Sequence, residues 1–223
     1  MIDPAADAHT RPDPARSALL TVDMQNDFTL AGAPAEIEDT RAVVEPIARL
    51  TAAFRAAGRP IVHVIRFYAP DGSDAERVRR SALQGGLELL APGSEGAEVV
   101  AGILPGGAPA LEAGRLRAGQ PQPLGESEWA MYKPRWNAFF ETPLAPFLRE
   151  QGVDTVVVSG CNYPGCVRAT TVGATEHDFR TVLARDAVSR LDPLGIDEMT
   201  ALGVVALDTR TCAGWFARGD AAA

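Results

Sequence analysis

Short apolar, β-branched runs alternate with helical patterns along this chain. Six runs predict strands, at 18–22, 61–67, 128–133, 155–158, 181–184 and 204–207. Between them, apolar residues recur three and four positions apart, as at Val43, Ile47, Leu50 and Phe54, which predicts amphipathic helices. Continuous apolar strands are typical of a parallel sheet covered on both faces. The pattern therefore predicts an α/β fold, a three-layer α/β/α sandwich with a six-stranded, mostly parallel, doubly wound sheet.

Two segments lack this alternation. Residues 1–16 are polar and proline-rich, without the apolar core of a secretory signal, and we expect them to form a disordered tail before a domain at 17–218. Residues 85–125 are rich in Gly, Pro and Ala and predict mostly loop with a helical turn or two. Such an insert is often an active-site lid, although tolerated surface variation fits equally.

Composition limits the classes of partner. The net charge of −8 argues against nucleic acid, whose phosphates require a basic face. No apolar run approaches the roughly 20 residues of a membrane span, so no membrane partner is expected. Three cysteines, an odd number in a chain without a signal, favour reduced thiols and a cytoplasmic location.

Three chemically active side chains follow the ends of predicted strands: Asp23, Lys133 and Cys166. Parallel sheets bind ligands at the carboxyl ends of their strands, so these groups are expected to converge. Cys166 lies where a strand passes into a helix. Free N–H groups and the helix dipole at such a position stabilise a thiolate or an oxyanion.

The three groups form a coherent set for nucleophilic catalysis. A carboxylate can accept the thiol proton, and a neighbouring ammonium stabilises the thiolate. Lys133 is the single lysine beside 20 arginines, which indicates a role that a guanidinium cannot fill. No histidine is required, since His9, His63 and His177 lie outside these loops. His63 falls within a predicted strand, which favours a structural role.

Three motifs resemble those of a known family. They are DMQNDF at 23–28, YKPRWNAF at 132–139 and SGCNYPGCVRATTVGA at 159–174. In this order they resemble the isochorismatase-like cysteine hydrolases, and the resemblance extends over about residues 18–205. It implies a homodimer or homotetramer and a six-stranded α/β/α sheet.

The resemblance also implies roles for individual residues. Asp23, Lys133 and Cys166 correspond to the family's catalytic triad. The peptide bond between Cys161 and Asn162 is expected to be cis. The backbone amides of Asn162 or Tyr163, together with that of Cys166, are expected to form an oxyanion hole.

Departures from the family pattern reduce the number of reactions that this chain is expected to catalyse. The presence of Cys166 disfavours the vinyl-ether cleavage of true isochorismatases. Residues 63–70 lack the Asp-x-His spacing of the metal-binding nicotinamidase branch, so no metal and no other cofactor are predicted. The CN-[FY]-P turn before the cysteine resembles an amidohydrolase branch near streptothricin hydrolase and N-carbamoylsarcosine amidase-like members.

The sequence therefore predicts a cysteine-dependent hydrolase that cleaves a C–N bond of a small amide, carbamoyl compound or lactam through a thioester. Two alternatives remain open: a non-catalytic binding or assembly subunit, and a vinyl-ether-cleaving isochorismatase-type hydrolase. Cys161 and Cys212 are expected to be structural.

Side chains in loops around the expected crevice are candidates for substrate binding. A guanidinium there would pair with a substrate carboxylate, although Arg66 could equally bridge to a surface acid. The candidates are Gln25, Phe28, Arg66, Tyr68, Trp136, Asn137, Asn162 and Tyr163.

Overall fold

The central strand β1 (Ser17–Val22) is buried along its whole length in the computed structural model, which describes residues 7–217. Leu19 joins one hydrophobic cluster, whereas Leu20 and Val22 join a second. Because successive side chains of a strand point to opposite faces, the two clusters lie on the two faces of the sheet. A strand that is apolar on both faces requires helices on both sides.

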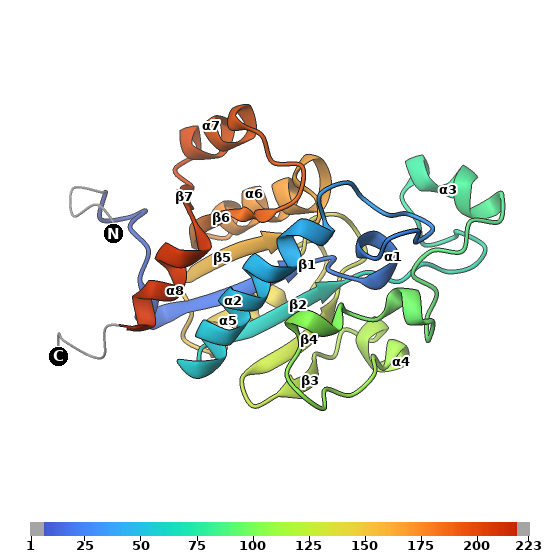
Figure 1. The fold of residues 1–223 in the computed structure, drawn as a ribbon, viewed down its shortest axis with the longest axis horizontal. Coiled ribbons are helices and arrows are strands. Elements are labelled where there is room, and N and C mark those ends of the chain that lie inside the picture. The colour runs from blue at the N-terminus through green and yellow to red at the C-terminus, as the bar shows by residue number, and fades with distance from the viewer. Residues whose placement is uncertain (1–6, 218–223) are drawn as a thin grey trace.

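The sheet contains seven strands in the order β3-β4-β2-β1-β5-β6-β7 (Figure 1). Six are parallel to their neighbours: β1, β2 (Ile61–Ile65), β4 (Glu128–Tyr132), β5 (Thr155–Gly160), β6 (Arg180–Val188) and β7 (Val205–Leu207). The seventh, β3 (Gln122–Gly125), pairs antiparallel with β4 at one edge. The predicted mostly parallel α/β sheet is confirmed, with one strand more than expected.

Helices cover both faces of this sheet. On one face lie α2 (Val44–Ala56) and α8 (Thr209–Ala217), where Phe54 meets Phe216 edge to face at 5.0 Å. The second cluster includes residues of α5 (Leu144–Glu150), α6 (Arg168–Glu176) and α7 (Pro193–Ala201). Shorter helices occur in the loops: α1 (Asn26–Thr29), α3 (Arg77–Gln84) and α4 (Ala113–Arg117).

The chain winds from β1 to β2 and β4 on one side, and from β5 to β6 and β7 on the other. β1 and β5 are therefore the neighbours between which the winding direction changes. Loops after the carboxyl ends of two such strands diverge, which leaves room for a ligand between them. This relationship places the turn that follows β1 beside the turn that follows β5.

The segment 85–125 contains α4 and β3, and the strand was not predicted. Part of the segment is fixed to the turn after β1. Asn26 N donates to Glu98 O and Val100 N donates to Met24 O, each at 2.9 Å, and Gln25 forms an isolated bridge with Val99. Residues 95–100 therefore form a wall beside that turn.

The described part of the predicted tail lies against the domain. Asp13 N donates to Thr155 Oγ1 at 3.0 Å, and Arg16 pairs with Asp154 at 3.0 Å. Residues 7–16 are thus held by β5 and the loop before it, in contrast to the disorder expected for 1–16. Residues 1–6 and 218–223, the last position of the predicted domain among them, lie outside the described residues. No helix in the described part is long and apolar enough to span a bilayer.

Candidate active site

Asp23, Lys133 and Cys166 meet beyond the carboxyl ends of β1, β4 and β5. Lys133 Nζ lies 2.9 Å from Asp23 Oδ2 and 3.4 Å from Cys166 Sγ. The neighbouring strand β2 fixes two of the three backbones, because Asp23 N donates to Val64 O and Lys133 N donates to Ile65 O, both at 2.9 Å. The convergence predicted from the strand ends is therefore observed.

Asp23 has an unusual backbone and an unpartnered oxygen. Its φ is 52°, in the left-handed region that residues other than glycine rarely adopt. Its Oδ1 is buried and, among residues 7–217, has no hydrogen-bond partner. A buried carboxylate oxygen is normally satisfied by a donor, so this oxygen is available to accept a proton from a reacting group.

The electrostatics favour a neutral thiol at rest. Burial raises the pKa of Cys166, the negative charge of Asp23 raises it further, and Lys133 only partly opposes them. Burial lowers the pKa of Lys133, but the negative charge of Asp23 and the hydrogen bonds to Asp23 and Cys166 outweigh it, so the pKa is raised and the ammonium persists. Burial and the adjacent carboxylate thus exceed the stabilisation of a thiolate that Lys133 and the helix provide, so the thiol keeps its proton until a group accepts it.

Cys166 lies in a π-helical turn, Tyr163–Val167, between β5 and α6. The predicted passage from strand to helix is confirmed, with this wider turn at its start. π-Turns recur at functional sites. The peptide bond between Cys161 and Asn162 is cis, as the family resemblance implies.

Backbone amides near Cys166 differ in their availability. Tyr163 N donates to Ser189 O at 3.0 Å and is therefore not free to bind an oxyanion. The N–H of Asn162 has no partner within the described residues. Of the two alternatives predicted to act with the Cys166 amide, Asn162 therefore remains as the candidate.

The side chain of Gln25 belongs to the scaffold. It is fully buried, and its Nε2 donates to the carbonyls of Arg66 at 2.9 Å and Ala97 at 2.6 Å. Its Oε1 accepts from Arg66 N at 2.9 Å. The prediction that Gln25 binds substrate is wrong, since both ends of its amide join the end of β2 to the 95–100 wall.

The side chain of Tyr163 is also held by internal partners. Its hydroxyl donates to Gly195 O at 2.8 Å, and its ring packs within the second hydrophobic cluster. A β-carbon on Gly195 would lie 2.4 Å from the ring, which shows how closely α7 approaches it. Tyr163 therefore anchors α7 and does not line the site as predicted.

Arg66 is buried in a cage of internal partners. It donates to the carbonyls of Phe67 and Asp74 and to Tyr132 Oη, and its guanidinium lies 4.2 Å from the Tyr68 ring. Asp74 and Glu76 carboxylates lie 3.8 Å from it. The alternative that Arg66 bridges to acids of the protein is the one observed, although Asp74 and Glu76 are only partly exposed, and these contacts leave no free fork for a substrate carboxylate.

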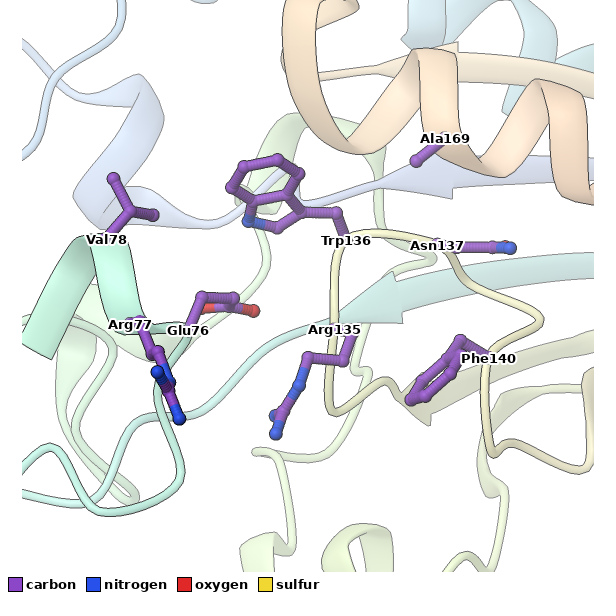
Figure 2. A pocket seen from close by; sticks show the side chains of 8 residues that line it. All are labelled: Glu76, Arg77, Val78, Arg135, Trp136, Asn137, Phe140 and Ala169. Carbon is purple, nitrogen blue, oxygen red and sulfur yellow. The ribbon is translucent and has the colours of Figure 1, made fainter.

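Five of the predicted substrate-binding side chains remain to be placed, and two of them are buried. Tyr68 is buried and donates to Glu76 Oε2 at 3.1 Å, while Phe28 is buried in the first hydrophobic cluster. Trp136 is exposed and Asn137 half-buried, and both line a cavity of about 410 Å³ (Figure 2). Asn162 is half-buried directly before the π-turn.

Other residues at the site were not singled out from the sequence. Arg77 and Arg135 also line this cavity. The position of Arg135 in the sequence, two residues after Lys133, could have identified it as a candidate for substrate binding. Asp27 is buried and its Oδ2 accepts from Leu90 N at 2.6 Å, which holds the start of the 85–125 segment to the DMQNDF turn.

His63 has the structural role predicted for it. Its Nδ1 lies 2.8 Å from Thr21 Oγ1, and its Nε2 lies 2.7 Å from Glu128 Oε1. Arg55 completes the network by pairing with both oxygens of Glu128, at 2.8 and 2.9 Å. Both ring nitrogens of His63 are therefore engaged inside the sheet.

Comparison with known proteins identifies the family. The chain matches the Isochorismatase domain over residues 17–111 and 115–211. It is 36% identical over 175 residues to maleamate amidohydrolase of Pseudomonas putida, which covers 78% of this chain and 72% of the relative. It is 30% identical over 181 residues to a probable inactive nicotinamidase of Arabidopsis thaliana, with coverage of 79% and 82%. This chain belongs to the isochorismatase family.

Solved structures agree with that assignment. An isochorismatase family protein from Desulfovibrio vulgaris superposes with a TM-score of 0.76 at 37% identity, covering 91% of this chain and 99% of that one. N-carbamoylsarcosine amidase from Thermoplasma acidophilum gives 0.68 at 26% identity, covering 87% and 96%. The similarity therefore extends over nearly the whole described fold.

Proposed function

We propose that this protein is a cysteine-dependent amidohydrolase that cleaves a C–N bond of a small amide, carbamoyl compound or lactam through a thioester. The observation that carries the proposal is the position of Lys133 Nζ, within 2.9 Å of Asp23 Oδ2 and 3.4 Å of Cys166 Sγ. Relatives named maleamate amidohydrolase and N-carbamoylsarcosine amidase support the type of bond.

Acylation begins from the neutral thiol. Cys166 Sγ attacks the carbonyl carbon while its proton passes to Asp23, whose Oδ1 is the buried, unpartnered oxygen. The resulting oxyanion accepts hydrogen bonds from the amides of Asn162 and Cys166. Asp23 then gives the proton to the leaving nitrogen, the C–N bond breaks, and an acyl thioester remains on Cys166.

Deacylation reverses these proton movements. Asp23 accepts a proton from a water molecule, and the oxygen of that water attacks the thioester carbonyl. The C–S bond breaks, the carboxylic product leaves, and the proton returns to the Cys166 sulfur. One group thus acts as base and acid in alternation, which is sufficient because the two half-reactions need the proton at different times.

Lys133 remains protonated throughout this cycle. Its ammonium lies next to both groups that carry negative charge in turn, the Asp23 carboxylate and the developing Cys166 thiolate. A compact cation can contact both at once from a buried position, whereas the wider guanidinium plane requires more space. The role of Lys133 is therefore electrostatic.

The test compares wild type with Cys166→Ala and with the matched control Cys212→Ala, which removes a buried thiol from α8. Ammonia release is measured on a panel of small amides and carbamoyl compounds, and mass spectrometry follows lactam opening. We expect turnover in wild type and the control and none in Cys166→Ala. Hydrolysis that survives in Cys166→Ala would overturn the cysteine mechanism.

The same panel separates the enzyme from a binding subunit. With a turned-over substrate, rapid acid quenching followed by mass spectrometry should detect an acyl adduct on the peptide that contains Cys166. If wild type binds panel members and hydrolyses none, the non-catalytic alternative is favoured.

A further inference from the structure

A cavity of about 410 Å³ lies beside the triad without including any of its three side chains. Its walls come from α3, from the loop after β4 and from α6 (Figure 2). These segments follow β2, β4 and β5, so the cavity opens at the same edge of the sheet as the triad. A volume of this size accommodates a group considerably larger than a carboxamide.

The cavity is connected to the reacting groups by short stretches of chain. Arg135 and Trp136 follow Lys133 by two and three residues, and Ala169 lies one helical turn beyond Cys166. Thr170 Oγ1 donates to Trp136 O at 3.4 Å, which ties this loop to α6. The segments that carry Lys133 and Cys166 therefore supply, within three residues of each, side chains that line this cavity.

Apolar side chains gather around the cavity. Of the six large hydrophobic side chains that are exposed within residues 7–217, three line it: Val78 at 74%, Trp136 at 39% and Phe140 at 45% exposure. Exposed apolar groups concentrated in one hollow indicate a binding site. Two aromatic rings suit a planar apolar ligand in particular.

Two arginines of the same cavity have no acidic partner among the described residues. Arg77 has no ion pair or side-chain hydrogen bond within the described part of the chain, and Arg135 donates only to the carbonyls of Asp74 and Pro134. Figure 2 shows both side chains extending to the same side of the Trp136 ring. This excess of cations occurs in a chain whose net charge is −8.

Glu76 is the acid of the cavity, and its charge is already matched. Its Oε2 accepts from Tyr68 Oη at 3.1 Å, and its Oε1 lies 3.8 Å from Arg66 Nε. Arg66 is itself buried. Glu76 therefore faces Tyr68 and Arg66 of the protein itself, and the guanidinium groups of Arg77 and Arg135 remain for a ligand.

We propose that this cavity binds the part of the substrate remote from the scissile bond, and that this part is a planar apolar group carrying a carboxylate. The inference rests on the proposed amidohydrolase function and names its substrate class. Trp136 and Phe140 contact the planar group, and Arg77 and Arg135 bind the carboxylate, for which guanidinium forks are well suited. A ligand of this kind contacts both the apolar side chains and the arginines that line the cavity.

Four amides test the proposal, because they vary charge and ring independently. They are (4-carboxyphenyl)acetamide, phenylacetamide, succinamate and butyramide. We expect wild type to hydrolyse (4-carboxyphenyl)acetamide with the highest kcat/KM and butyramide with the lowest. A preference for butyramide would overturn the substrate class while leaving the proposed function intact.

Variants assign the preference to the cavity. Arg77→Gln and Arg135→Gln should each lower kcat/KM for the two carboxylated amides about 3- to 10-fold and change phenylacetamide less than about twofold. Trp136→Ala should affect the two ring-bearing amides selectively. Arg11→Gln, an exposed arginine before β1, is the matched control. Equal losses on charged and uncharged amides would overturn the assignment.

Binding to Cys166→Ala keeps the proposal testable if no amide is hydrolysed. Isothermal calorimetry with (4-carboxyphenyl)acetamide should show binding that is weakened at least about threefold when Arg77→Gln or Arg135→Gln is added. Absence of binding at millimolar ligand, or equal affinity for phenylacetamide, would overturn it. Selective binding combined with hydrolysis that survives in Cys166→Ala would instead sink the proposed mechanism and retain the cavity's specificity.

Discussion

A β-carbon on Gly160 would lie 2.2 Å from the carbonyl oxygen of Val22 and 2.6 Å from its nitrogen. The two residues are register partners at the ends of β5 and β1. Asp23 follows Val22, and the turn that carries Cys166 follows Gly160. The absence of a side chain at Gly160 therefore determines how closely the backbones that position Asp23 and Cys166 approach each other.

Gly160→Ala should destabilise the protein severely. The added methyl group collides with backbone, which cannot rotate away, and φ at this position is +119°. We expect a loss of about 3 kcal/mol or more in the free energy of unfolding, measured by urea denaturation. Gly106→Ala is the control, because its β-carbon would have no neighbour within 4 Å. Similar stability of the two variants would show that β1 and β5 can separate at this point without cost.

Two different substitutions of Lys133, one that removes its charge and one that enlarges its head group, should each abolish most of the hydrolytic activity. Lys133→Met keeps much of the stem and removes the charge, whereas Lys133→Arg keeps the charge and enlarges the head. We expect kcat/KM to fall at least about 100-fold in both, because the ammonium contacts Asp23 and Cys166 together. Circular dichroism confirms the fold of each variant. Near-normal turnover by Lys133→Met would refute the electrostatic role.

Asp23→Asn should separate thiol ionisation from catalysis. The carboxylate raises the pKa of Cys166, so its removal should lower that pKa and speed alkylation by iodoacetamide at pH 8. Amide hydrolysis should fall in the same variant, because the proton carrier is lost. Mass spectrometry of the Cys166 peptide gives the alkylation rate, with Cys161 and Cys212 as internal references. Slower alkylation in Asp23→Asn would mean that the carboxylate activates the thiol directly.

Glu128 should make stability depend on pH in the acid range. Burial raises its pKa, but hydrogen bonds from His63 and Arg55 outweigh burial, so its pKa is lowered in the folded protein. The stabilisation is then fully present above the unfolded pKa of about 4.3 and is lost as pH falls through the lower folded value. Unfolding free energies measured between about pH 6 and pH 3 should show a shallower decline in Glu128→Gln. Glu45→Gln, at an exposed pair with Arg49, should keep the wild-type slope.

Much of the fold follows from features that the sequence carries locally. Apolar runs such as 155–158 are buried on both faces, and this property alone specifies a covered parallel sheet. β3 escaped prediction because Gln122, Pro123, Leu124 and Gly125 combine weak strand formers with a proline. Its pairing depends on β4, a contact that no local pattern encodes.

The residues of the site likewise include some that could be predicted from the sequence and some that could not. Asp23, Lys133 and Cys166 were predictable because strand ends and residue chemistry both pointed to them. The roles of Gln25 and Tyr163 were not, since a loop side chain turns toward whichever buried partner tertiary packing supplies. The resting thiol of Cys166 also required the structure, because burial is its largest cause and depth is not visible in a sequence pattern.

The two edges of the sheet constrain how copies of this chain can associate. β3 has four residues, lacks one N–H at Pro123 and shifts register before Gly125, while β7 at the opposite edge has three residues. Such edges offer little regular ladder to an incoming strand. A continuous intermolecular sheet is thereby disfavoured. Assembly of the chain would depend on side chains of helices and loops, and the sheets of two copies would not be joined by backbone hydrogen bonds.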